Sequence, residues 1–157
     1  MNNCLYLFTY VIALMLLHVA PCRASVVDSA FSLGVRDSIM IAHSFTGEEF
    51  GPAQALHGAT YTVDVDFSTP KLVEGSNWVI DIGAASGMLA EVLAKYNFKN
   101  LNDVFAENTT TEFMCRAIHN DLAIRLRGKC WQGGLRVKLH ESHKAWAAYS
   151  REVGPAK

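Results

Sequence analysis

Apolar and polar residues alternate most regularly between residues 61 and 67 (YTVDVDF). Because successive strand residues point to opposite faces, this pattern predicts a strand with one buried and one wet face. Residues 135–141 (LRVKLHE) alternate in the same way and predict the last strand. Residues 31–35 and 39–43 are expected to form a first strand interrupted at 36–38, and residues 78–82 a short third one.

Two segments instead show the spacing of amphipathic helices. Apolar residues recur at helical intervals over residues 83–96 and again after Thr109. Thr109 followed three residues later by Glu112 forms a capping box that predicts the start of the second helix, and Gly128 is expected to stop it. The order β-β-α-α-β favours the α+β class, with an antiparallel sheet carrying two helices on one face.

Bulk properties narrow the function classes. The chain has 157 residues, half of them hydrophobic, and a net charge of −1. These values suit one domain and give no reason to expect a nucleic acid or a membrane as partner. Two of the four cysteines, Cys115 and Cys130, fall in the folded part, too few for a disulfide framework.

Residues 1–24 are set apart from the predicted single domain of residues 25–157. They form an apolar leader that is interpreted as either a signal peptide or a start assigned too early. No Lys or Arg precedes the apolar run, so a cytoplasmic protein is expected. Export is the alternative, and it would admit a structural or interaction protein.

Two histidines carry the first hint of chemistry. His57 opens the alternating strand and His43 closes the strand before it. Brought together on paired strands, two imidazoles could begin a metal site, although zinc needs three or four ligands. The alternative is that they are simply polar residues at strand ends.

Several motifs in order resemble the 6-pyruvoyl-tetrahydropterin synthase and 6-carboxytetrahydropterin synthase family. They are AHSF at 42–45, LHGATY at 56–61, VIDI at 79–82, NTTTE at 108–112 and LHES at 139–142. The resemblance implies the tunnelling fold, in which sheets of neighbouring subunits join into a barrel and form a ring-like homo-oligomer, a trimer or hexamer. It also implies a zinc lyase that acts on 7,8-dihydroneopterin triphosphate.

The resemblance further implies roles for individual residues. His43 and His57 match two zinc ligands, Glu141 matches the carboxylate that anchors the pterin ring, and Thr110 falls where the family lines the ring pocket. A carboxylate suits ring binding because it can accept two hydrogen bonds from ring N–H groups. Gln54 stands where a variant subgroup has a glutamate and is assigned to substrate binding.

Three departures fall on the catalytic side of the motif. Ala59 replaces the third zinc histidine, Gly51 stands where the family has a cysteine, and residues 97–98 (Asn-Phe) replace an Asp-His pair. A working lyase would therefore need a rebuilt site. His143 is predicted as a replacement metal ligand or general base, and Glu49, or Glu48 beside it, as a carboxylate base if their loop folds inward.

The alternative is a paralogue without the synthase reaction. Such a protein would bind a pterin or purine-like ring through Glu141, without the family's zinc and cysteine chemistry. Fold alone does not choose between these reactions.

Overall fold

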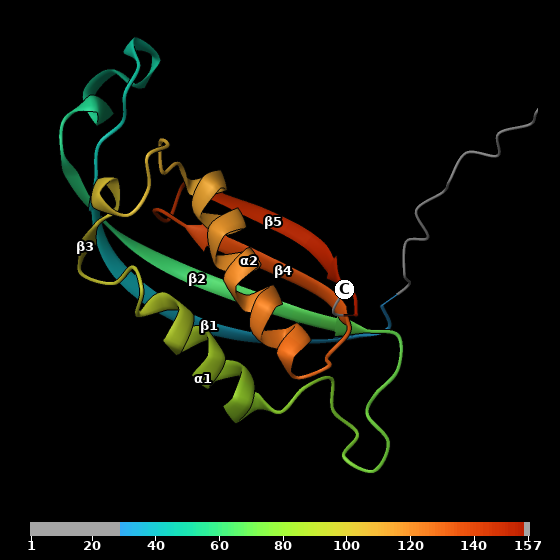
Figure 1. The fold of residues 1–157 in the computed structure, drawn as a ribbon. Helices are drawn as coiled ribbons and strands as arrows, with labels where there is room; N and C mark the ends of the chain where they lie inside the picture. Colours follow the sequence, from blue (N-terminus) through green and yellow to red (C-terminus); the bar gives the residue numbers. More distant parts are fainter. Residues whose placement is uncertain (1–28, 156–157) are drawn as a thin grey trace, which may run out of the picture.

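Two helices cover one face of a five-stranded sheet in the computed structural model, which describes residues 29–155 (Figure 1). The leader predicted at residues 1–24 lies outside this range. In chain order the elements are β1 (Phe31–His43), the 3-10 helix η1 (Glu48–Gln54), β2 (His57–Thr69), α1 (Ile82–Leu93), β3 (Lys99–Asn100), the 3-10 helix η2 (Leu101–Asp103), α2 (Thr111–Gly128), β4 (Gly133–His140) and β5 (Trp146–Val153).

The strands are ordered β3-β1-β2-β4-β5. All neighbours are antiparallel except β3, which runs parallel to β1 over two residues, so the sheet is mixed. The predicted α+β class with both helices on one face is confirmed. Strand β5 was not predicted, because as an edge strand it buries only Ala147 and Val153 and lacks a clear alternation.

Strand β1 is continuous, and the predicted interruption at residues 36–38 is wrong. These residues pair in unbroken register with residues 62–64 of β2. Arg36 and Asp64 are direct partners and form an ion pair on the exposed side of the sheet. Arg36 and Ser38 lie on the solvated face, whereas Asp37 is paired with Val63 on the inner face and stays exposed. Polar residues here therefore do not break the strand.

The short strand predicted at residues 78–82 is also wrong. Asp81 is instead the N-cap of α1, and its carboxylate accepts a hydrogen bond of 2.7 Å from the Ala84 amide. Val79 before it is buried, and its carbonyl accepts a hydrogen bond from the Trp131 indole. Val79 therefore anchors this loop in the core, whereas Trp78 and Ile82 stay exposed, and tertiary contacts override the strand preference of the segment.

The start of α2 differs from the prediction by one residue. Thr110, not Thr109, is the N-cap, and its hydroxyl accepts a hydrogen bond from the Phe113 amide at 3.3 Å. Thr109 is fully buried, and its hydroxyl contacts the His43 ring instead of capping the helix. Glu112 is exposed in the first turn, where a negative charge favours the helix dipole.

The core lies between the sheet and the two helices. Tyr61, Val63, Val65 and Phe67 are completely buried on the inner face of β2, as their alternation predicted. They meet the apolar faces of α1 and α2, which include Leu89, Val92, Ile118 and Leu122. Among the residues described, no helix combines the length and the apolar character needed to span a membrane.

Candidate functional site

His43 and His57 meet at the end of the β1–β2 pair. They are direct partners in the register, and their ring centroids are 4.5 Å apart. His43 ends β1 and His57 begins β2, so both side chains project to the inner, helix-covered side of the sheet beyond Tyr61. The structure therefore brings together the two residues predicted as metal ligands.

Glu141 joins these histidines from the end of β4. One ligand atom from each of His43, His57 and Glu141 lies within 4.8 Å of the other two. Among the described residues, this is the one group of three or more such side chains that could hold a metal ion. The residue predicted to anchor a ring thus also lies at the predicted metal site.

His43 is completely buried, and only one of its ring nitrogens has a partner. Nδ1 lies 3.1 Å from the hydroxyl of Thr109, whereas Nε2 is buried without a hydrogen bond. Burial lowers the pKa of His43, and the neighbouring His57 lowers it further, while Thr109 and Glu141 act in the opposite direction. The ring is therefore held neutral, the form in which an imidazole can ligate a metal.

His57 is oriented by its own backbone. Its Nδ1 donates a hydrogen bond of 2.9 Å to the carbonyl of Ala55. That bond fixes the tautomer in which Nε2 carries the free lone pair. Both histidines are thus held through Nδ1, which leaves Nε2 of each ring for a ligand.

Glu141 links the histidine pair to a cavity. The cavity has a volume of about 290 Å³ and is lined by Phe45, Thr110, Thr111, Glu112, Glu141, Ala145, Trp146 and Ala147. The Thr111 hydroxyl donates a hydrogen bond of 2.6 Å to Oε2 of Glu141 and so holds the carboxylate at the cavity wall. A cavity with aromatic walls and a fixed carboxylate suits a flat ring that bears N–H donors.

Three polar residues of this site were not assigned to it from the sequence, although Thr109 was predicted to cap the second helix. Thr109 contacts His43, Thr111 contacts Glu141, and the hydroxyl of Tyr61 is buried without a partner. Burial raises the pKa of Tyr61, and the charge of Glu141 adds to this effect. The run of three threonines at 109–111 is visible in the sequence. Without the three-dimensional contacts, however, the sequence does not show which threonine caps α2 and which ones contact the site residues.

Other predicted site residues lie apart from this group. His143 is exposed in the turn between β4 and β5, because the strand that would have directed it inward ends at His140. Glu49 is exposed in η1. Gln54 is also exposed, and its amide donates a hydrogen bond to the Gly51 carbonyl at 3.1 Å. The roles of these three residues stay predictions.

The positions that depart from the family motif have local structural roles. Ala59 pairs with Ile41 in the sheet and offers no ligand atom. Gly51 adopts a positive φ of 51° inside η1. Asn97 accepts a hydrogen bond from the Met40 amide at 3.0 Å, and Phe98 is 74% exposed.

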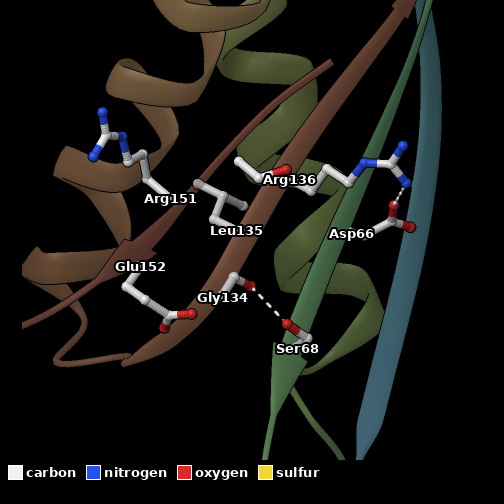
Figure 2. A pocket seen from close by; sticks show the side chains of 8 residues that line it. Asp66, Ser68, Gly134, Leu135, Arg136, Arg151 and Glu152 are labelled. Carbon is white, nitrogen blue, oxygen red and sulfur yellow. Dashed lines mark hydrogen bonds and ion pairs between the residues drawn. The ribbon is translucent and has the colours of Figure 1, made fainter. Parts of the chain in front are cut away.

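A second hollow lies on the face of the sheet away from the helices (Figure 2). Its volume is about 410 Å³, and its lining includes Asp66, Ser68, Arg136, Arg151 and Glu152. Arg136 forms an ion pair with Asp66 at 3.6 Å, so part of this charge is already compensated. None of these residues belongs to the histidine and glutamate group.

The family comparison agrees with the resemblance in the sequence. The family model described as 6-pyruvoyl tetrahydropterin synthase matches residues 32–152. No curated protein matches the chain.

Solved structures of similar fold come from distant relatives. The 6-pyruvoyl tetrahydropterin synthase of Caenorhabditis elegans has a TM-score of 0.68 and 20% identity, covering 77% of this chain and 95% of its own. That of Plasmodium vivax has a TM-score of 0.65 and 17% identity, covering 78% and 98%. That of Plasmodium falciparum has a TM-score of 0.64 and 16% identity, covering 80% and 99%. These likenesses show the fold.

Proposed function

Because this chain belongs to the 6-pyruvoyl tetrahydropterin synthase family, we propose that it is a pterin-binding lyase-type enzyme acting on 7,8-dihydroneopterin triphosphate. The product would be of the 6-carboxytetrahydropterin or 6-pyruvoyltetrahydropterin type. The observation that carries this proposal is the position of Glu141, which lies at once in the wall of the cavity and beside His43 and His57.

The ring would bind in the cavity beside α2. Glu141 accepts hydrogen bonds from ring N–H groups, a role that its fixed carboxylate supports. Thr110 lines the same cavity. Phe45 and Trp146 supply apolar walls for a flat heterocycle. Gln54, exposed in η1, is assigned to substrate binding on the motif alone.

The two histidines would hold a zinc ion. The orphaned Nε2 of His43 and the oriented ring of His57 fit a metal of this kind. When bound, zinc would polarise an oxygen of the substrate side chain and ease proton removal beside it. His143 and Glu49 are the candidate bases for that proton, and each is exposed, so each would have to move toward the cavity.

The reaction itself is the first test. Purified full-length protein is incubated with zinc and 7,8-dihydroneopterin triphosphate, and triphosphate release is followed together with the pterin products. Release should be abolished in Glu141→Gln and retained in Glu112→Gln, since Glu112 lines the same cavity but lies outside the metal group. Equal release from both variants would overturn the role of Glu141.

A second function is favoured by the three departures from the motif. The chain lacks the third zinc histidine at Ala59 and the cysteine nucleophile at Gly51. It also lacks the Asp-His pair for proton transfer at residues 97–98. In this alternative the protein binds a pterin or purine-like ring through Glu141 without releasing triphosphate. Tight ring binding that Glu141→Gln abolishes, with no turnover, would support it. Absence of both turnover and ring binding would contradict both functions.

We further propose a ring-like homo-oligomer, a trimer or hexamer. In the described chain β5 pairs only with β4, and β3 covers only two residues of β1, so both sheet edges are open. Open edges are normally paired or covered, and joining the sheets of neighbouring subunits would close them. Sedimentation or light scattering gives the subunit number. A cytoplasmic location is proposed with it, to be checked by fractionation.

A further inference from the structure

We propose that Glu141 is the third protein ligand of a divalent metal held by His43 and His57, in place of the imidazole that Ala59 lacks. This inference deepens the proposed function and rests on it. It assigns to Glu141 a bond to the metal in addition to contact with the ring.

The first support is the grouping of the side chains. Ligand atoms of His43, His57 and Glu141 come from three strand ends and lie within 4.8 Å of one another. Ligands of a tetrahedral zinc at about 2.0–2.1 Å from the metal are about 3.4 Å apart. The observed separations are at most 4.8 Å, so the three side chains would have to move closer together to bind an ion.

The second support is the set of outer contacts. Nδ1 of His43 pairs with Thr109, Nδ1 of His57 donates to the Ala55 carbonyl, and Glu141 accepts from Thr111. Metal-ligating histidines are generally held in this way through the other ring nitrogen, and ligating carboxylates are also hydrogen-bonded. All three proposed ligands therefore already have the partner that would orient them.

The third support is the buried Nε2 of His43. It has no hydrogen-bond partner although it is shielded from water. A buried nitrogen of this kind is unfavourable unless something binds it. A metal between the histidines and Glu141 satisfies it, whereas a second hydrogen bond is not offered by the surrounding side chains of the described chain.

Two histidines and one glutamate form a known ligand set for catalytic zinc, and that set leaves a fourth position open. Since Glu141 also lines the cavity, the metal site would adjoin the space proposed for the ring. A carboxylate has about four lone-pair sites. Glu141 can therefore bind the metal, accept from Thr111 and still accept a ring N–H.

The experiment measures metal binding without substrate. Full-length protein is stripped with a chelator, and zinc affinity is measured by competition with a chromophoric chelator. Cobalt(II) is then added as a spectroscopic probe of the ligand set. The wild type should bind one ion per chain. Glu141→Gln and His57→Ala should each weaken zinc binding by more than about 100-fold and change the cobalt spectrum, because even an outer partner is worth about 10–100-fold.

Two further variants locate the effect. Glu112→Gln is the matched control and should bind zinc as the wild type does, since Glu112 is exposed in the same cavity wall. Thr111→Val should lose about 10-fold, as an outer partner of Glu141. Circular dichroism confirms that each variant is folded.

The inference is overturned if Glu141→Gln binds zinc within about 3-fold of the wild type, or if the wild type binds no stoichiometric ion. Neopterin binding is measured separately in the presence of chelator. Loss of ring binding with normal metal binding would count against the proposed function and leave the metal site standing.

Discussion

His43 and His57 face each other across the last rung of the β1–β2 ladder, with their ring centroids 4.5 Å apart. The two positions differ in burial. His43 is fully buried and contacts Phe45, His57 and Tyr61, whereas His57 is half-buried at the rim. Variants at His57 therefore test metal binding with less damage to the fold than variants at His43.

Zinc should stabilise the folded protein through this pair. At about 100 times its dissociation constant, zinc adds about 2.7 kcal/mol to the free energy of unfolding, or a rise of about 8 °C in the thermal midpoint. Chelator should reverse the rise, and His57→Ala should abolish it. Scanning calorimetry with and without zinc checks this.

His143→Ala is the matched control for that measurement. His143 is exposed in the β4–β5 turn, so the variant should keep the full zinc response. Loss of the response in His143→Ala would mean that the turn folds inward and that His143 supplies a ligand, the role predicted for it from the sequence.

Thr110 combines a structural and a proposed binding role, which two variants can separate. Its hydroxyl caps α2 by accepting from the Phe113 amide. Thr110→Ala should lower the free energy of unfolding by about 1 kcal/mol, whereas Thr110→Ser keeps the capping oxygen and should be nearly neutral. Urea unfolding measures both.

Ring binding then tests the second role of Thr110. If the hydroxyl also contacts the ring, neopterin affinity should fall in the Ala variant and recover in the Ser variant. Equal affinities in both variants and the wild type would limit Thr110 to capping.

The site could be predicted from the sequence where position alone decides the contact. The sequence predicts that His43 ends one strand and His57 begins the next, and the motif resemblance assigns roles to both histidines and to Glu141. The register that makes the two histidines direct partners comes from the structure. The sequence did not predict that Glu141 meets the histidines, because that depends on how β4 lies beside β2 and on where it ends.

Local patterns failed where side chains compete for one role. Thr109 and Thr110 are equally good caps, and packing gave the cap to Thr110 because Thr109 is buried against His43. His143 was expected on a continued strand, but the backbone turns at Glu141, whose amide donates to the Ala145 carbonyl. Such choices depend on tertiary contacts and not on residue preference.

His119 should make the protein less stable in mild acid. The residue is buried in α2 against Tyr149, and neither ring nitrogen has a partner with hydrogen-bond geometry. Burial lowers its pKa below 6.5, although the nearby Arg151 backbone and Asn120 side chain counter this in part. Protonation of His119 is therefore more favourable in the unfolded chain than in the folded protein. The free energy of unfolding falls as pH drops below 6.5.

His119→Leu should weaken that dependence. At pH 8 the free energy of unfolding should change by less than about 1 kcal/mol, since the lost contact with Tyr149 offsets the removal of two unpartnered nitrogens. Between pH 6.5 and 5 the decline should be shallower than in the wild type. Part of it should persist, because burial also lowers the pKa of His43. An unchanged slope would show that His119 does not contribute.

The ionised carboxylate of Asp64 should stabilise the folded protein, and this contribution should be lost in stronger acid. Its carboxylate accepts hydrogen bonds from Arg36 Nη2 and from His140 Nε2, each at 2.9 Å. The hydrogen bonds from Arg36, and then that from His140, lower the pKa of Asp64 from 3.8 to about 2, against the effect of burial. A lowered carboxyl pKa stabilises the fold above pH 3.8, and this contribution disappears as pH falls from about 4 to 2.

Asp64→Asn should therefore cost about 1 kcal/mol at pH 7, a value reduced by solvent because the Arg36 side chain is 67% exposed. The difference from the wild type should shrink as pH falls from about 4 to 2. Asp66→Asn is the matched control on the same strand, since its ion pair with Arg136 is longer, at 3.6 Å. Urea unfolding across this pH range measures both variants. An equal loss in the two variants would mean that net charge on this face, and not the Arg36–Asp64–His140 contacts, sets the acid dependence.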